Sequence, residues 1–385
     1  MPVETAVTTV QDKFSTVRQE LNSVMIERSE EIDFTLTALI AQEHALLVGP
    51  PGVGKSMLLD AITDWCDGRR FSILVNKFTS PEEMFGPVSL SGLKEDRYQR
   101  ITTGKLPEAD FAFVDEVFKG SSAILNSMLK ILNERQFDNG SAGMQKVPLK
   151  LCLGASNEWP GEGDQGKELN ALFDRFLLRK SVKPIAGTDG RRRLLWGGDH
   201  KPKLSGKLLP AELQQANAEA NALPWSDAAK ANLETVLQEL SAEGIRPGDR
   251  RQYKAVRIAQ AYAWLLGADE VESDHLDILS HVLWDDPIEQ PAKASQIISK
   301  VSNPLHFVIN GFMVEAHNIK GDLKDPKNLA AASAALAKLE EIQTKLKSIK
   351  SDSQKMKDSR RDVSRMIRDI RVAAMPPSKA NEEDE

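Results

Sequence analysis

The sequence predicts an α/β fold in which a parallel sheet is followed by an all-helical region and a helical C-terminal extension. Short apolar runs alternate with helix-like segments between residue 44 and about residue 183, which is typical of parallel strands joined by helices. A glycine-rich turn directly follows the first apolar run, and beyond residue 225 the apolar pattern is helical. These observations separate an N-terminal α/β core from a C-terminal helical part.

Composition narrows the class of protein. The chain has 385 residues, of which 41% are hydrophobic and 28% are charged, as in a soluble protein of two or three domains. Its net charge of −6 argues against bulk attraction to nucleic acid or to an anionic membrane. No apolar stretch approaches the ~20 residues of a membrane span, and the N-terminus lacks an apolar signal segment. We therefore expect a cytoplasmic protein without a membrane span.

Cysteines and histidines give no sign of a metal centre. Cys66 and Cys152 are far apart and lack partners at metal-ligand spacing, and the six histidines form no HxH or HExxH pattern. A reduced compartment is the simplest explanation for so few cysteines. We expect no intrinsic metal site built from these residues.

The first part of the chain is expected to be helical, followed by alternating strands and helices. Residues 1–43 have a helical pattern, with Ser29 as a possible N-cap. The predicted strands cover residues 45–48, 71–75, 111–114, 147–155 and 177–182, and the predicted helices between them cover 55–66, 80–85, 120–134 and 167–176.

Two insertions interrupt this alternation. Residues 86–106 are predicted to hold a small β-hairpin, and Asp138-Asn139-Gly140 is a strong turn signal for a second hairpin. Solvated surface loops are the alternative for both insertions.

The glycine-rich turn has the sequence of a phosphate-binding loop. It runs Gly49, Pro50, Pro51, Gly52, Val53, Gly54, Lys55, Ser56, with Met57 continuing as a helix. The glycines let successive backbone N–H groups point at phosphate oxygens, and the helix N-terminus adds partial positive charge. We expect residues 49–57 to bind the nucleotide, with Lys55 on the β- and γ-phosphates and Ser56 on Mg²⁺. The alternative is a tight strand-to-helix turn with incidental Lys and Ser.

A second apolar strand ends in paired carboxylates, Asp115 and Glu116. After a phosphate-binding loop, this pattern predicts that Asp115 binds Mg²⁺ through water and that Glu116 polarises the attacking water. Alone, it would equally fit a strand end with solvated acids.

Three further polar residues, later in the chain, are candidates for contact with the phosphates or the attacking water. Asn157 ends another predicted strand and is expected to contact the γ-phosphate or the attacking water, or else to cap the next turn. Arg175 lies at the end of a helix and can point into a neighbouring subunit's site, although an ion pair with Asp174 or Glu168 is the alternative. Arg251 or its neighbour Arg250 is expected to reach back over the phosphates, with Arg251 preferred.

The rest of the chain divides by composition. Residues 184–223 are rich in Pro, Gly and Arg, so we place the end of the core at residue 190 and a linker at 191–223. An all-α lid is expected at 224–289, with helices at 225–240, 249–266 and 273–283 and N-caps at Ser226 and Ser273. A helical extension follows at 290–375, and residues 376–385 form an acidic tail that we expect to be disordered.

Apolar residues recur every seven positions in the extension. Ile342, Ile349, Met356, Val363 and Ile370 form one row, and Leu339, Leu346 and Ile367 form part of a second row that Ser353 and Arg360 interrupt. A partial coiled-coil seam and one face of an ordinary docked helix fit this pattern about equally. Residues 345–371 are basic, which indicates a solvated face or a surface for an acidic partner.

The ordered set of motifs resembles the AAA+ ATPases over about residues 25–285. Residues 80–87, 106–110, 131–137 and 156–158 further resemble the MoxR branch and its RavA-like group. This resemblance implies an αβα core and a ring, usually a hexamer, with ATP sites between subunits. It also implies a partner with a von Willebrand factor A (vWA) domain. Residues 290–385 do not match the accessory domain of the best-known RavA-type protein.

The leading hypothesis is therefore an ATPase that uses ATP and Mg²⁺ to remodel or activate a protein partner. A nucleic-acid motor or loader of the AAA+ class is the main alternative, but the acidic chain lacks an aromatic and basic binding platform. A scaffold that does not hydrolyse ATP is disfavoured because Lys55, Ser56, Asp115 and Glu116 are all present.

Overall fold

The computed structural model describes residues 9–160, 166–198, 200–323, 328–349 and 354–374. The chain forms two compact units, Met1–Ile298 and Ser299–Glu385. The predicted acidic tail and Ser353 lie outside the described residues. No helix among the described residues is both long and apolar enough to cross a membrane.

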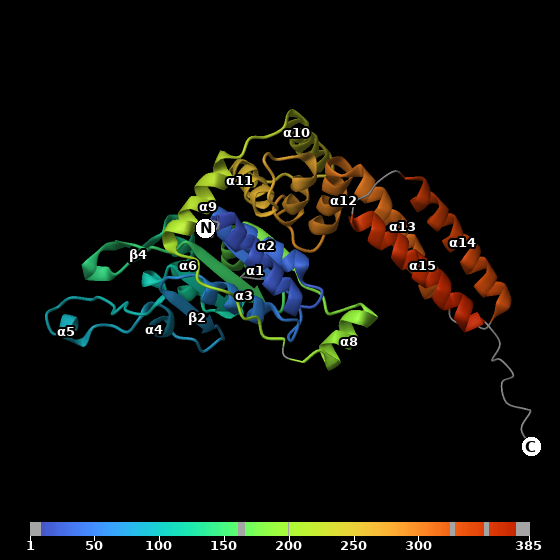
Figure 1. Ribbon diagram of the computed structural model, residues 1–385. Helices are drawn as coiled ribbons and strands as arrows, with labels where there is room; N and C mark the ends of the chain where they lie inside the picture. The colour runs from blue at the N-terminus through green and yellow to red at the C-terminus, as the bar shows by residue number, and fades with distance from the viewer. Residues whose placement is uncertain (1–8, 161–165, 199, 324–327, 350–353, 375–385) are drawn as a thin grey trace, which may run out of the picture. The chain divides into compact units, whose positions relative to one another are not determined.

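A five-stranded parallel sheet organises the first unit (Figure 1). Its strands are β1 (Ala45–Val48), β2 (Arg70–Leu74), β3 (Phe111–Asp115), β6 (Leu151–Ser156) and β7 (Leu178–Ser181), in the order β2-β3-β6-β1-β7. The central strands are buried along their length, which explains why they appear in the sequence as continuous apolar runs. This parallel sheet with its helices confirms the predicted α/β class.

Helices connect and cover these strands. The first part of the unit contains α1 (Val10–Val24), α2 (Ser29–Ala41), α3 (Lys55–Trp65), α4 (Pro81–Phe85), α6 (Ser122–Glu134) and α7 (Gly166–Arg175). The predicted N-cap at Ser29 is wrong, because Arg28 occupies the cap position and Ser29 is already helical. The strand predicted over residues 147–155 begins later, as β6 at Leu151, because the chain first forms the short strand β5 (Met144–Lys146).

The region that we expected to be a linker contains two helices, α8 (Thr188–Trp196) and α9 (Pro210–Ala222). Leu213, Ala216 and Ala220 of α9 are buried, and α9 contacts α2 and α11 (Asp249–Leu265). A small-residue face that packs on other helices is easily missed in a sequence because alanine gives a weak apolar signal.

The lid follows the expected pattern, with differences at its ends. It comprises α10 (Asp227–Ala242), α11 and the 3₁₀ segment η4 (Ser273–His281). Ser226 caps α10 by accepting a hydrogen bond from the Ala229 N–H at 3.1 Å. The predicted cap at Ser273 is wrong, because Glu272 holds that position. The unit ends within α12 (Gln290–Ser302), whose Ala294, Ile297 and Ile298 are buried.

The two insertions differ from each other. The second is a hairpin as predicted, with β4 (Gln136–Asp138) antiparallel to β5. The first has a single antiparallel bridge, between Val88 and Arg100, and a short helix α5 (Leu90–Leu93) in place of a regular hairpin. The Ser89 hydroxyl accepts a hydrogen bond from the Gly92 N–H at 3.1 Å, which favours a helical turn here over a strand.

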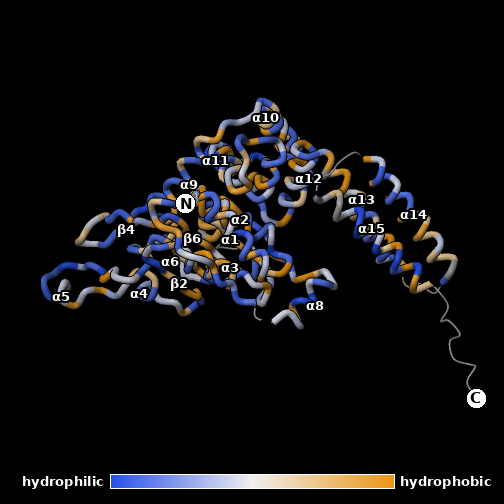
Figure 2. Tube along the Cα trace, in the orientation of Figure 1, coloured by the Kyte–Doolittle hydropathy of each residue, from blue (hydrophilic) through white to orange (hydrophobic). Residues whose placement is uncertain are grey.

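Hydrogen bonds join the two insertions to each other. The side chain of Asn139 accepts from the Arg100 N–H at 2.7 Å and donates to the Arg100 carbonyl at 3.2 Å. The Ser141 N–H donates to the Tyr98 carbonyl at 2.7 Å. Figure 1 shows α5 and β4 projecting on the same side of the core, and Figure 2 shows polar residues along much of the α5 segment. The insertions therefore behave as one structural unit.

The second unit packs α13 (Pro304–Asp322), α14 (Leu329–Ser348) and α15 (Gln354–Ala374) around one apolar core. The seven-residue rows supply this core: Leu339, Ile342, Leu346, Met356, Val363, Ile367 and Ile370 are all buried. The pattern is thus satisfied within the chain, as a face of docked helices. Arg360, which interrupts the second row, donates hydrogen bonds to the Leu346 and Ile349 carbonyls at the end of α14.

Candidate active site

The phosphate-binding loop connects β1 to α3. Gly52 and Gly54 have φ angles of +79° and +87°, which favour glycine because a Cβ strains the left-handed region. Gly49 is required for a different reason, since an added Cβ there would overlap the carbonyl oxygen of Val182. The loop conformation therefore depends on its glycines at three positions.

Lys55 is the first residue of α3, and its side chain is buried. The ammonium donates to the carbonyls of Gly49 and Pro50, the latter at 2.9 Å, and to Asn157 Oδ1 at 3.1 Å. Burial lowers the pKa of Lys55 from its ordinary value, while the charges of Asp115 and Glu116 oppose that shift. The cation is held at the end of the loop that faces the paired carboxylates.

Asp115 ends β3 beside the loop. Ser56 Oγ donates a hydrogen bond to Asp115 Oδ2 at 3.0 Å, so a hydroxyl and a carboxylate lie side by side. Hard oxygen donors of this kind suit Mg²⁺, which is usually held by one or two protein oxygens together with water and phosphate. The donor set therefore fits the predicted metal.

Glu116 follows in a left-handed backbone conformation, with φ +54°, which is uncommon outside glycine and is often found at functional sites. Its side chain is 8% exposed. Asn157 Nδ2 donates to Glu116 Oε1, and Lys119 Nζ lies 3.2 Å from Oε2. Asn157 thus bridges Lys55 and Glu116.

Sheet order explains why these residues meet. The strands β3, β6 and β1 are adjacent and parallel, so their carboxyl ends lie at one edge. Asp115 ends β3 and Glu116 follows it, Asn157 follows β6, and Lys55 follows β1 through the loop. The structure brings together the five sequence-predicted residues Lys55, Ser56, Asp115, Glu116 and Asn157.

A cavity of about 370 Å³ opens on the other flank of the loop. Its lining comes from three parts of the chain: Val24, Met25, Ile26 and Arg28; Pro50–Gly54 with Met57; and Pro184, Ile185, Arg191, Leu194 and His200. Lys55, Ser56, Asp115 and Glu116 do not line it. Apolar side chains of Met25, Ile26 and Leu194 give it a surface suited to a nucleotide base.

Sequence reasoning missed Arg28, which supports this loop. Its side chain is buried, and Nε donates to the Val53 carbonyl at 3.0 Å while Nη1 donates to the Glu27 carbonyl at 2.7 Å. No motif announces this role, because it depends on the fold placing the α1–α2 turn against the loop.

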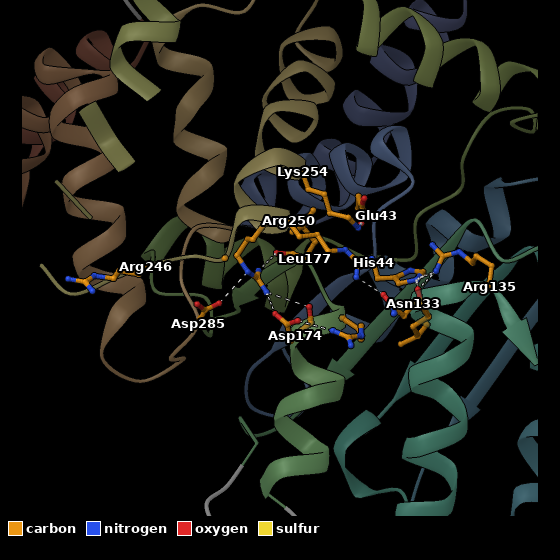
Figure 3. A pocket seen from close by; sticks show the side chains of 14 residues that line it. Glu43, His44, Asn133, Arg135, Asp174, Leu177, Arg246, Arg250, Lys254 and Asp285 are labelled. Atoms are coloured by element: carbon orange, nitrogen blue, oxygen red, sulfur yellow. Dashed lines mark hydrogen bonds and ion pairs between the residues drawn. The ribbon is translucent and has the colours of Figure 1, made fainter. Parts of the chain in front are cut away.

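Arg175 and Arg251 lie elsewhere, at a cavity of about 630 Å³ between the core and the lid (Figure 3). Arg175 Nη1 donates to Asp174 Oδ2 at 2.9 Å, which is the ion pair named as the alternative. Arg251 is 5% exposed, and its Nη2 donates to Asp174 Oδ1 at 2.6 Å. Arg251 Nη1 also donates to the Leu177 and Val282 carbonyls.

Both candidate lid arginines line this cavity and not the cavity beside the phosphate-binding loop, and their reach over the phosphates stays a prediction. The buried contacts of Arg251 fix it on α7 and the lid, and Arg250 donates to Asn133 Oδ1 at 2.6 Å. The sequence suggests Asp174 as a partner of Arg175 alone, whereas its carboxylate accepts hydrogen bonds from both Arg175 and Arg251. Burial tends to raise the pKa of Asp174, but the Arg251 hydrogen bond and the charges of Arg251 and Arg175 lower it below its ordinary value.

Comparison with known proteins identifies the family. The model of the MoxR domain in the MoxR-vWA-beta-propeller ternary systems matches residues 12–220, more than half of the chain. The chain belongs to the MoxR family of AAA+ ATPases. An AAA lid domain model matches residues 231–298, in agreement with the helical lid. The finer RavA-like grouping stays a prediction.

The chain is also similar to individual proteins and to a solved structure. The uncharacterized protein MJ0812 of Methanocaldococcus jannaschii is 41% identical over 310 residues, which cover 80% of this chain and 79% of that protein. The chaperone MoxR1 of Mycobacterium tuberculosis is 22% identical over 163 residues, 42% of each chain. A crystal structure from Cytophaga hutchinsonii has a TM-score of 0.58 at 17% identity and covers 76% of this chain and 94% of that one. At that identity it shows the shared fold.

Proposed function

We propose that this MoxR-family chain is a cytoplasmic ATPase whose sites lie between the subunits of a ring, most simply a hexamer. It hydrolyses ATP with Mg²⁺ and uses the cycle to remodel a protein partner with a vWA domain. The observation that carries the catalytic part is the bridge from Lys55 through Asn157 to Glu116 at one edge of the sheet. That bridge joins a phosphate-binding cation to a candidate general base.

In this proposal the loop residues 49–57 bind the nucleotide and Lys55 contacts its β- and γ-phosphates. Ser56 and Asp115 would hold Mg²⁺, which supplies charge neutralisation on the phosphate oxygens. Glu116 orients and polarises the attacking water through its carboxylate, and Asn157 fixes that carboxylate next to the γ-phosphate position. Burial of Glu116 keeps bulk water away from the carboxylate.

The arginine cavity supplies the other half of the site. Six cationic side chains line it, Arg135, Arg175, Arg246, Arg250, Arg251 and Lys254, against three carboxylates, Glu43, Asp174 and Asp285. This excess of positive charge suits an anion, and the nucleotide loop of the same subunit does not line the cavity. We therefore assign Arg175 and Arg251 to the phosphates of a neighbouring subunit's ATP, where delocalised charge stabilises the transition state.

The partner is proposed from the family. The matching domain model describes MoxR domains in MoxR-vWA-beta-propeller systems, and one relative is named a chaperone. The joined insertions expose Leu90, Tyr98, Ile101 and Met144, so they offer apolar surface for a protein. We propose that they contact the partner and respond to hydrolysis, and that the second unit assists recruitment.

Steady-state ATPase assays with and without Mg²⁺ test the catalytic proposal. Glu116→Gln is expected to bind nucleotide normally and to lose turnover by about two orders of magnitude or more, because the water loses its polarising carboxylate. Glu134→Gln, which changes an exposed glutamate on α6, is the matched control and should behave as wild type. Equal rates for Glu116→Gln and wild type would remove Glu116 from this role.

A single side chain tests the partner-facing unit. Asn139→Ala removes both hydrogen bonds to Arg100 and should leave basal ATPase within a few-fold, because the change is outside the nucleotide site. Stimulation of turnover by a vWA-domain partner should be lost. Unchanged stimulation in Asn139→Ala would contradict the assignment of the insertions.

A further inference from the structure

Arg191 lies on α8 and lines the 370 Å³ cavity beside the phosphate-binding loop. Two arginines, Arg28 and Arg191, and one histidine, His200, line the cavity. No carboxylate from the described residues lines it. A cavity with cations and no acid favours an anionic ligand at its polar end.

Of these two arginines, only Arg191 is available to a ligand. Arg28 is buried and committed to the Val53 and Glu27 carbonyls. Arg191 is exposed, and its guanidinium makes no hydrogen bond or ion pair with any residue that the structure describes. An unpaired guanidinium beside a phosphate-binding loop is well suited to bidentate contact with phosphate oxygens.

The α1–α2 turn fixes α8 in this place. Glu27 Oε2 accepts from the Ala186 N–H at 2.9 Å, and Oε1 accepts from the Gly187 N–H at 3.0 Å, at the N-terminal side of α8. Arg193 Nη2 donates to the Ser23 carbonyl at 3.0 Å. Because Arg28 in the same turn holds Val53, one turn positions both the loop and α8.

We propose that Arg191 is a nucleotide-binding residue of its own subunit and that its guanidinium contacts the phosphate chain on the α-phosphate side. Arg191 would supply, to the nucleotide of its own subunit, the positive charge that the sequence analysis expected from a lid arginine. Arg251 lines the arginine cavity instead. The inference rests on the proposed nucleotide site and extends it to α8, a segment outside the recognised motifs.

Equilibrium binding of fluorescent ADP, with adenosine as a competitor, tests the assignment. Arg191→Ala should weaken ADP binding roughly tenfold, the size expected for one charge-assisted contact, and should change adenosine binding less than twofold. Arg192→Ala is the matched control, since Arg192 neighbours Arg191 on α8 but does not line the cavity. Arg191→Lys should retain part of the affinity because it keeps the charge.

Two outcomes would overturn the inference. ADP binding by Arg191→Ala equal to that of Arg192→Ala would show that Arg191 makes no contact with the nucleotide. Equal losses for ADP and adenosine would assign Arg191 to the base and not to the phosphates. Lys55→Ala distinguishes failure of the Arg191 inference from failure of the proposed nucleotide site. If Lys55→Ala binds ADP as wild type does, the nucleotide site itself is wrong.

Discussion

The phosphate-loop site and the arginine cavity are built in opposite ways. The first gathers Lys55, Asn157 and Glu116 at one sheet edge, where each satisfies the next by hydrogen bonds. The second draws on the end of α2, the end of α6, the end of α7 and the lid, and its cations outnumber its acids. The difference supports the proposal that the loop holds the nucleotide within one chain, whereas the arginine cavity, with its excess of positive charge, receives an anion from a neighbouring subunit.

Disrupting the hydrogen-bond bridge from Lys55 through Asn157 to Glu116 should give the largest effect on turnover. Asn157→Ala removes the contacts of Asn157 with Lys55 and Glu116, so kcat should fall by about a hundredfold, comparable with loss of one preorganised donor, while nucleotide affinity changes little. Asn133→Ala changes an asparagine that lines the arginine cavity, and it is the control. Its nucleotide binding, measured on single subunits, should equal that of wild type. A change in Asn157→Ala confined to KM would show that Asn157 serves binding and not chemistry.

Substitutions of the lid arginines in the arginine cavity should lower the free energy of unfolding. Arg251→Met removes the hydrogen bonds of Arg251 to the Leu177 and Val282 carbonyls, of which the Val282 carbonyl keeps the Trp284 N–H as a donor. The variant should lower the free energy of unfolding by about 1–3 kcal/mol. Arg250→Met removes one exposed contact with Asn133 and should cost less than about 0.5 kcal/mol. Urea unfolding of both variants measures this. Equal stability losses would contradict the distinction between a buried and an exposed lid arginine.

The same contrast explains what the sequence could predict. Lys55, Ser56, Asp115, Glu116 and Asn157 each follow a strand of a parallel sheet, so their meeting at one edge follows from topology. The position of Arg251 could not be predicted, because it depends on how the lid packs against α7. Neither the support that Arg28 gives to the loop nor the role proposed for Arg191 carried a signal in the sequence, since both depend on a turn and a helix brought together by tertiary packing.

The buried histidine His44, which lines the arginine cavity, should make the free energy of unfolding depend on pH. Burial and the charge of Arg135 hold the pKa of His44 well below its ordinary value, and its Nδ1 accepts from the Cys152 N–H at 2.9 Å. Below about pH 6.5 the unfolded chain binds a proton that native His44 does not, so the free energy of unfolding falls as pH falls.

Denaturant titrations between pH 5 and pH 8 measure this dependence. Each histidine that stays neutral in the native state contributes a slope of up to about 1.4 kcal/mol per pH unit below its unfolded pKa. His44→Gln should reduce this slope by up to about 1.4 kcal/mol per pH unit, the contribution of one bound proton. An unchanged slope would show that His44 is protonated in the native state as readily as in the unfolded chain.

Mixing two inactive variants tests the central claim that the two regions complete one another across subunits. Lys55→Ala removes the phosphate cation of the loop, and Arg175→Ala removes the arginine assigned to the neighbouring site, so each alone should be nearly inactive. Mixed rings should regain ATPase activity wherever an intact loop faces an intact Arg175, and turnover per subunit should rise with protein concentration. Mixtures that stay as inactive as their components, or a monomer that is active at every concentration, would contradict the account.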